Sequence, residues 1–143
     1  MTFLLDTNVI SEWLKARPEP RVVAWLAGVD EDRTYISTIT IGELRHGVER
    51  LAHGRRRKRL DEWVHYDLPL RFEGRILSID LPVAHAWGTI TARRERMGRP
   101  IGPLDALIAA TAEVHGLTLV TRDVRGFASA APSLLNPWAD DAE

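Results

Sequence analysis

Four carboxylates in this sequence are spaced so that a folded chain could bring them to one place. Asp6 directly follows a short apolar run, and Asp123 comes two residues after another one. Glu43 and Asp105 each stand in the first turns of a segment with helical spacing. Carboxylates held close together repel one another and tend to take up protons unless a cation neutralises them. The group therefore predicts a site for a hard divalent ion, Mg²⁺ or alternatively Mn²⁺.

A divalent ion held by carboxylates lowers the pKa of a bound water, orients it and stabilises charge on a phosphodiester under attack. This chemistry requires no side-chain nucleophile, and the chain has no cysteine and no recognisable Ser-His-Asp arrangement. The five histidines form neither an HxxxH nor an HExxH motif, which argues against a zinc site. The sequence thus suits metal-activated water as the nucleophile.

Each acid also has a simpler explanation. Asp6 could cap a helix, and Glu43 follows Thr40 by three residues, as in a capping box. Asp105 would complement a helix macrodipole, and Asp123 could be an ordinary turn residue. A carboxylate in a first helical turn can stabilise its helix and also bind a metal, so the argument depends on whether the four acids converge.

The elements that must position these acids alternate along the chain. Apolar and β-branched runs predict strands at residues 2–5, 34–37, 75–79 and 117–121, with a short edge strand at 134–137. Helical spacing and punctuation by Gly and Pro predict helices at residues 8–15, 21–27, 41–51, 55–66, 81–97 and 104–115. This alternation predicts an α/β fold with a small, mainly parallel sheet of four or five strands flanked by helices.

Ligands of open α/β sheets bind at the carboxyl ends of the strands. Asp6 and Asp123 follow strands directly, and Glu43 begins the helix after the second strand. The helix of Asp105 must run antiparallel to the strand that it feeds, which brings its start to the same edge. All four acids are therefore expected to converge there.

Composition limits the class of protein. At 143 residues and 45% hydrophobic content, the chain suits one domain, expected at residues 1–138, with a short acidic tail at 139–143. The absence of cysteine excludes disulfides and zinc-thiolate sites. No apolar run approaches the roughly 20 residues that a membrane helix needs, and the N-terminus lacks a basic leader. We expect a cytoplasmic protein with no membrane contact.

Charge is uneven although the net charge is −1. Residues 53–59 read HGRRRKR, and a second basic group comprises Arg93, Arg94, Arg96 and Arg99. Both groups could be solvated helix faces and ends, and both could contact phosphates beside an acidic pocket.

Four motifs together resemble those of one nuclease family. The segment Leu4-Leu5-Asp6-Thr7-Asn8-Val9-Ile10 resembles the opening motif of PIN-domain nucleases. The second, third and fourth acidic motifs of that family resemble Ile41-Gly42-Glu43-Leu44, residues 103–112 (PLDALIAATA) and Leu119-Val120-Thr121-Arg122-Asp123. The motifs occur in the family's order and span almost the whole chain. The compact length resembles VapC-type toxins of bacterial toxin–antitoxin pairs, including FitB-type proteins.

The resemblance implies a three-layer sandwich and Mg²⁺- or Mn²⁺-dependent endonucleolytic cleavage of RNA. It also implies a homodimer, a cognate antitoxin that inserts a segment near the active site, and contact with operator DNA only through the antitoxin complex.

Residue by residue, Asp6, Glu43, Asp105 and Asp123 match the family's four acidic positions. Thr7, Asn8 and Thr121 match polar positions that support the acids by hydrogen bonds. By this resemblance the three aspartates dominate metal binding, directly or through water. Glu43 positions or deprotonates the attacking water, or holds a second metal. Arg45, His46 or Arg122 could neutralise the scissile phosphate, or could simply be solvated charges.

Two other interpretations remain open. A receiver-like Mg²⁺-binding signalling domain would need a lysine after the last strand, whereas Lys15 and Lys58, the two lysines, lie in expected helices. A catalytically weak PIN-fold protein could act mainly through antitoxin and operator binding. The intact acids argue against this second alternative.

Overall fold

The computed structural model describes residues 1–139 and contains a five-stranded, fully parallel sheet. The strands are β1 (Phe3–Leu5), β2 (Thr34–Ser37), β3 (Ile76–Leu77), β4 (Thr118–Val120) and β5 (Leu134–Leu135), in the order β3-β2-β1-β4-β5. Phe3 is in register with Thr34 on one side and with Thr118 on the other. The predicted α/β fold with a parallel sheet is confirmed, and β1 lies at its centre.

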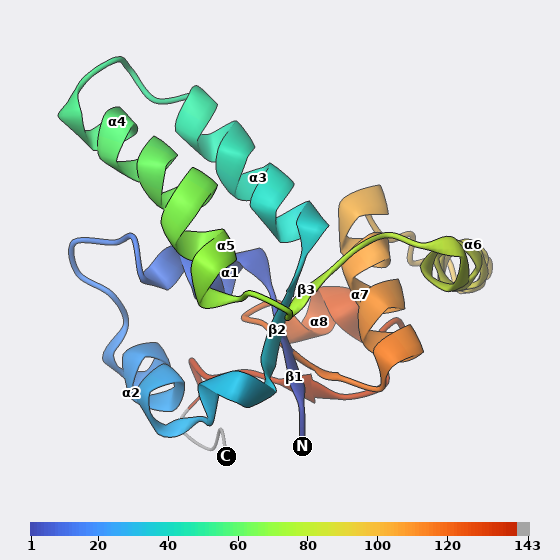
Figure 1. Ribbon diagram of the computed structural model, residues 1–143. Helices are drawn as coiled ribbons and strands as arrows, with labels where there is room; N and C mark the ends of the chain where they lie inside the picture. The colour runs from blue at the N-terminus through green and yellow to red at the C-terminus, as the bar shows by residue number, and fades with distance from the viewer. Residues whose placement is uncertain (140–143) are drawn as a thin grey trace.

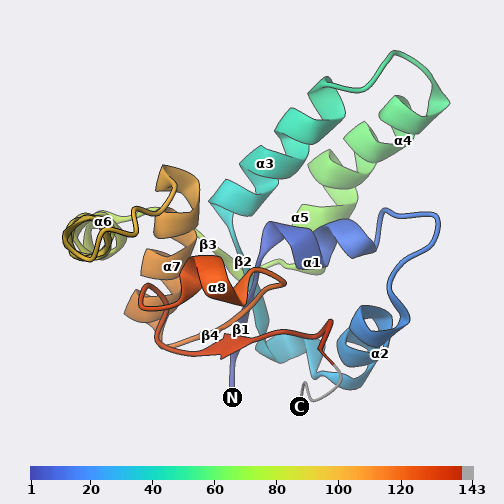
Figure 2. The same cartoon turned by 180° about the vertical axis from the view of Figure 1, so that it is seen from behind.

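Helices occupy the connections between the strands (Figure 1). They are α1 (Thr7–Glu12), α2 (Pro20–Gly28), α3 (Thr38–Glu49), α4 (Arg55–Glu62), α5 (Leu68–Arg71), α6 (Leu81–Arg96), α7 (Pro103–His115) and α8 (Val124–Phe127). A 3₁₀ turn, Glu31–Arg33, precedes β2, and a π-helical turn, Trp63–Asp67, joins α4 to α5. In Figures 1 and 2, α3 and α4 run side by side away from the sheet, while α6 lies against α7.

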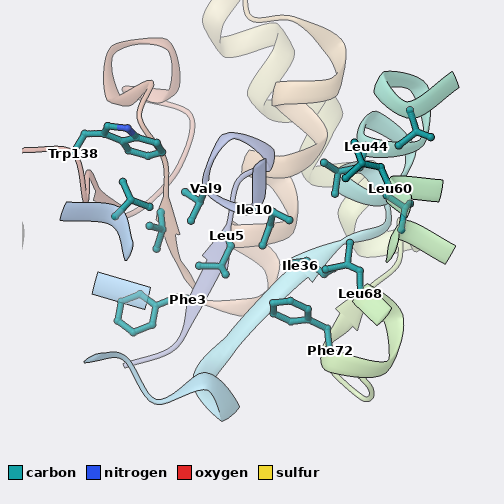
Figure 3. Packing of buried hydrophobic residues seen from close by; sticks show 14 residues of the cluster. Phe3, Leu5, Val9, Ile10, Ile36, Leu44, Leu60, Leu68, Phe72 and Trp138 are labelled. Carbon is teal, nitrogen blue, oxygen red and sulfur yellow. The ribbon is translucent and has the colours of Figure 1, made fainter. Parts of the chain in front are cut away.

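The sheet separates two hydrophobic clusters, which makes three layers. Successive side chains of a strand point to opposite faces. Phe3 and Leu5 accordingly join the cluster under α1, α3 and the α4–α5 segment, whereas Leu4 joins the cluster under α6 and α7. Figure 3 shows the first cluster, with Ile36 and Phe72 packed on the same face as Leu5. The predicted three-layer sandwich is therefore confirmed.

Several element boundaries differ from the prediction. The helix predicted at 8–15 ends at Glu12, and the one predicted at 41–51 starts at Thr38, because the Ser37 hydroxyl accepts a hydrogen bond from the Ile39 amide and caps it. The helix predicted to end at residue 66 continues through the π-helical turn to Arg71. The strand predicted at 75–79 shrinks to two residues, since only Ile76 and Leu77 pair with β2.

One helix was missed, because α8 has only four residues and no apolar period. Of the acidic tail predicted at 139–143, all but residue 139 lies outside the described residues. Within the part of the chain that the structure describes, no helix is long and apolar enough to cross a membrane.

Candidate functional site

All four predicted carboxylates line one cavity of about 350 Å³ at the carboxyl edge of the sheet. We call it the acidic cavity; its lining residues are Asp6, Thr7, Asn8, Ser11, Glu43, Asp105, Asp123 and Phe127. The strand ends of β1 and β4 supply two of the acids, and the starts of α3 and α7 supply the other two. The structure thus brings the four acids together as the topology predicted.

Asp6 is the buried acid of the cavity, only 6% exposed. Its Oδ1 accepts the Thr7 amide at 2.8 Å, and Oδ2 accepts the Thr121 hydroxyl at 2.8 Å and the Asn8 side-chain amide at 3.3 Å. Burial raises the pKa of Asp6 to about 6, and the charges of Asp105 and Glu43 add to the rise, although the hydrogen bonds from Thr121 and Thr7 oppose it. A cation in the cavity would remove this penalty.

The Thr121 hydroxyl links the two strand ends. It donates to Asp6 and accepts the Asp123 amide at 3.0 Å. Asn8 spans the same gap, because its amide nitrogen lies 3.4 Å from the Thr121 hydroxyl and its Oδ1 accepts the Arg122 amide at 3.4 Å. The two strand-end acids therefore share one set of polar neighbours.

Glu43 is half-buried and oriented by a contact from α1. The Thr7 hydroxyl donates to Glu43 Oε1 at 2.6 Å and lies 3.1 Å from the Thr40 hydroxyl. Because Ser37 caps α3, the capping-box explanation for Glu43 is wrong. Its carboxylate faces the acidic cavity instead.

Asp105 lies in the first turn of α7, whose cap residue Gly102 offers no side-chain hydrogen bond. Within residues 1–139, no protein group donates a hydrogen bond to the Asp105 carboxylate. Burial raises its pKa, and the charges of Glu43 and Asp123 raise it further. Asp105 thus faces the cavity with its oxygens free for a ligand.

The donor set fits a hard divalent ion, since it consists of carboxylate, hydroxyl and amide oxygens. Among the described residues, no three acidic or histidine side chains are already grouped closely enough to hold an ion. An ion would therefore require some of the carboxylates to move toward it or to act through water, as magnesium sites commonly do.

Two lining residues were not predicted. Ser11 stands one helical turn after Thr7 and donates to the Thr7 carbonyl oxygen at 2.9 Å, so helical spacing could have identified it. Phe127 is buried and belongs to α8. No sequence signal pointed to Phe127, because α8 itself was not predicted.

The basic residues are distributed differently from the expectation. Arg45 pairs with Asp61 and Glu49 on the outside of α3 and α4, away from the acids. Arg122 lies with its guanidinium 5.7 Å from the Trp138 ring centre. His46 lines a neighbouring cavity that also includes Glu43.

In the second basic group, the interpretation as a solvated residue or a phosphate contact is wrong for Arg94. Arg94 is 4% exposed, and within residues 1–139 it donates only to backbone carbonyl oxygens, so it is neither solvated nor available to a phosphate.

Comparison with known proteins identifies the family. The sequence model of the PIN domain family matches residues 3–131 of this chain. Toxin FitB of Neisseria gonorrhoeae is 44% identical over 137 residues, covering 96% of this chain and 99% of the relative. VapC ribonuclease Y4jK of Sinorhizobium fredii is 37% identical over 135 residues, covering 94% and 96%. The tRNA(fMet)-specific endonuclease VapC of Shigella flexneri is 30% identical over 141 residues, covering 97% and 99%.

Solved structures similar to this chain come from the same group of proteins as these relatives. The structure of FitAB bound to an IR36 DNA fragment contains a chain with a TM-score of 0.93 and 40% identity, and the match covers 99% of both chains. The DNA-bound VapBC from Salmonella typhimurium gives a TM-score of 0.80 at 30% identity, covering 97% of this chain and 99% of the other. The match also removes the receiver-like interpretation. This chain therefore belongs to the PIN-domain family, among the relatives of Toxin FitB and the VapC ribonucleases.

Proposed function

We propose that this protein is a metal-dependent endoribonuclease and the toxin of a toxin–antitoxin pair. The observation that carries the proposal is the convergence of Asp6, Glu43, Asp105 and Asp123 on one cavity of about 350 Å³. Two of these acids have raised pKa values because burial and neighbouring charges disfavour their ionised forms. A cavity that disfavours its own negative charge is suited to a divalent cation.

Each acid has a distinct part in this proposal. Asp6, Asp105 and Asp123 hold Mg²⁺, or Mn²⁺ in its place, directly or through water. When bound, the ion activates water and stabilises charge on the phosphodiester. Glu43, held by the Thr7 hydroxyl, positions the attacking water and takes its proton, or alternatively contributes to a second metal. Thr121 and Asn8 fix the Asp6 carboxylate between them.

The proposed partners are RNA as substrate and a cognate antitoxin as inhibitor. A groove of about 300 Å³ between α1, α3 and α4 is lined mainly by apolar residues, among them Leu14, Val48 and Leu60. It shares Thr7, Ser11 and Glu43 with the acidic cavity. An antitoxin segment in this groove would therefore reach the acids. We also propose a homodimer and contact with operator DNA through the antitoxin alone, in line with the FitAB and VapBC complexes solved with DNA.

One experiment tests the activity and the site together. Purified protein is incubated with total RNA in Mg²⁺, in Mn²⁺ and in EDTA, beside Asp6→Asn and Glu113→Gln variants. Glu113 is an exposed acid on α7 that lies outside the acidic cavity. We expect cleavage by the parent and by Glu113→Gln that disappears with EDTA and in Asp6→Asn. Equal cleavage by the parent and Asp6→Asn would indicate a contaminant and reject the site, whereas no cleavage by the parent in either metal would favour the catalytically weak alternative.

A further inference from the structure

A buried arginine near the end of α6 has an unusual set of partners. Arg94 is 4% exposed, although arginine is rarely so buried without an acidic partner. Within residues 1–139, no carboxylate pairs with it. Its Nη1 donates to the carbonyl oxygens of Gly126 and Ala128 at 2.9 and 3.0 Å, and its Nε donates to that of Arg99 at 2.7 Å. The buried guanidinium of Arg94 thus binds main-chain carbonyl oxygens where an acidic side chain would be usual.

Two of these carbonyls belong to α8 and the residue that ends it. A helix of only four residues can satisfy few of its own carbonyls, and so short a helix is unstable by itself. A cation at a helix C-terminus satisfies the carbonyls and suits the helix dipole. Arg93 extends the support, because its Nε and Nη2 donate to the Ser129 carbonyl oxygen at 3.2 and 2.8 Å. Ser129 has a φ of 65°, which is uncommon for a residue other than glycine.

The opposite end of the same helix carries a site acid. Asp123 caps α8, and its Oδ1 accepts the Gly126 amide at 3.0 Å. A Cβ atom at position 126 would lie 2.7 Å from Asp123 Cγ and would overlap its Oδ2. The carboxylate therefore packs directly on a glycine whose N–H it binds and whose carbonyl Arg94 holds.

We propose that Arg94 is a positioning residue for the Asp123 carboxylate and acts through the main chain of Gly126. Because the guanidinium is rigid and planar, the bond from Nε to the Arg99 carbonyl orients Nη1, which holds the Gly126 and Ala128 carbonyls. The Gly126 carbonyl lies in the peptide plane that follows the Gly126 Cα, and the Gly126 amide lies in the plane before it. Anchoring the first plane limits how far the amide can turn from Asp123, which holds the carboxylate at the acidic cavity. Only the consequence for metal binding rests on the proposed function.

The experiment compares Arg94→Met, Arg94→Lys and Gly126→Ala with Ile90→Ala. Ile90 is fully buried on α6, one turn before Arg94, so its truncation loosens the same helix without touching α8 carbonyls. The first measurement is the hydrogen exchange and amide chemical shift of Gly126 in metal-free protein. Each variant is measured at the same number of degrees below its own melting temperature. Under this condition the Gly126 amide should exchange about tenfold faster in Arg94→Met than in Ile90→Ala, because its hydrogen bond to Asp123 is weakened. Equal exchange and unchanged shifts would overturn the proposal.

The second measurement is Mn²⁺ affinity by calorimetry. Arg94→Met and Gly126→Ala should weaken Mn²⁺ binding roughly 10- to 100-fold, as loss of an orienting group does, with Arg94→Lys between them and the parent. Ile90→Ala should bind as the parent does. Parental affinity in a folded Arg94→Met variant would contradict the inference.

These outcomes separate the positioning role from the proposed function. If the parent binds no Mn²⁺, the proposed function fails, and the Gly126 amide still decides the role of Arg94. If Arg94→Met does not fold, Arg94→Lys decides, because it keeps the charge but lacks the planar guanidinium that the bond from Nε to the Arg99 carbonyl orients. A Gly126 amide that is unchanged in Arg94→Lys would then overturn the proposal.

Discussion

The two strand-end acids of the cavity are supported in opposite ways. Asp6 and Asp123 each follow a parallel strand and cap the short helix after it. Asp6 is buried, and it accepts hydrogen bonds from the Thr7 amide at the start of α1 and from the Thr121 hydroxyl just after the neighbouring strand β4. Asp123 is exposed, and the one hydrogen bond that its carboxylate accepts within the described chain comes from Gly126. The Asp6 carboxylate is fixed by burial and by several hydrogen bonds. The Asp123 carboxylate depends on α8, which Arg94 of α6 holds.

The difference shows two solutions to one requirement. Burial fixes a carboxylate in place but disfavours its charge, as the raised pKa of Asp6 shows. Exposure avoids that cost, yet the geometry must then come from neighbouring groups. The site combines one acid of each kind, and the following predictions test whether they differ as the structure indicates.

The largest effect is expected from removing either charge. Asp6→Asn and Asp123→Asn should each lower metal-dependent RNA cleavage by about 1,000-fold, because several kcal/mol of stabilisation by the bound ion is lost. Initial cleavage rates with saturating Mg²⁺ measure this. A residual rate above about one tenth of the parent in either variant would remove that residue from the site.

The pH dependence of stability should distinguish the two acids next. Because the folded pKa of Asp6 rises from 3.8 to about 6, its contribution to stability is present below pH 4 and is lost as the pH rises through about 6. The displacement corresponds to roughly 3 kcal/mol at 1.36 kcal/mol for each pH unit. Asp105, whose pKa is also raised, acts in the same direction.

Urea unfolding of metal-free protein between pH 4 and 7 measures this loss. Asp6→Asn should lack most of it and be more stable than the parent at pH 7, whereas Asp123→Asn should retain it. Added Mg²⁺ should restore stability to the parent at pH 7, since binding to the folded state alone is stabilising. A parent whose metal-free stability is flat across this pH range would contradict the prediction.

A smaller effect is expected at the hydroxyl shared by both acids. Thr121→Val removes the donor to Asp6 and the acceptor of the Asp123 amide, and should weaken Mn²⁺ binding about tenfold. Thr111→Val is the matched control, because Thr111 is equally buried, and among the described residues its hydroxyl bonds only to the Leu107 carbonyl oxygen of its own helix. Equal Mn²⁺ affinities in the two variants would show that Thr121 has only a structural role.

The smallest effect is expected outside the cavity. Arg45→Met breaks the ion pairs with Asp61 and Glu49 between α3 and α4. Partly exposed ion pairs contribute about 0–1 kcal/mol, so the free energy of unfolding should fall by no more than about 1 kcal/mol. RNA cleavage should be unchanged. A tenfold loss of cleavage would return Arg45 to the role of phosphate contact.

Sequence reasoning succeeded where position depends on chain topology. Asp6 and Asp123 could be placed because carboxyl ends of parallel strands share an edge. It failed where an element depends on distant partners. Helix α8 has a glycine among its four residues and no apolar period, and the carbonyl of that glycine is held by Arg94, which lies 32 residues earlier. The basic group at residues 93–99 was therefore predicted to lie at the surface, although Arg94 is buried and binds the Gly126 carbonyl of α8.

The order of the strands has a consequence for when the site can exist during synthesis. Every strand pair in the sheet is parallel, so no two neighbours can form as a local hairpin. The pairing of β1 with β4 joins residues that are more than a hundred positions apart. Such pairing is slow, because a long loop must close before the contact is made. During synthesis Asp6 therefore emerges more than a hundred residues before its partner Asp123, and the acidic cavity cannot form until Asp123 has followed.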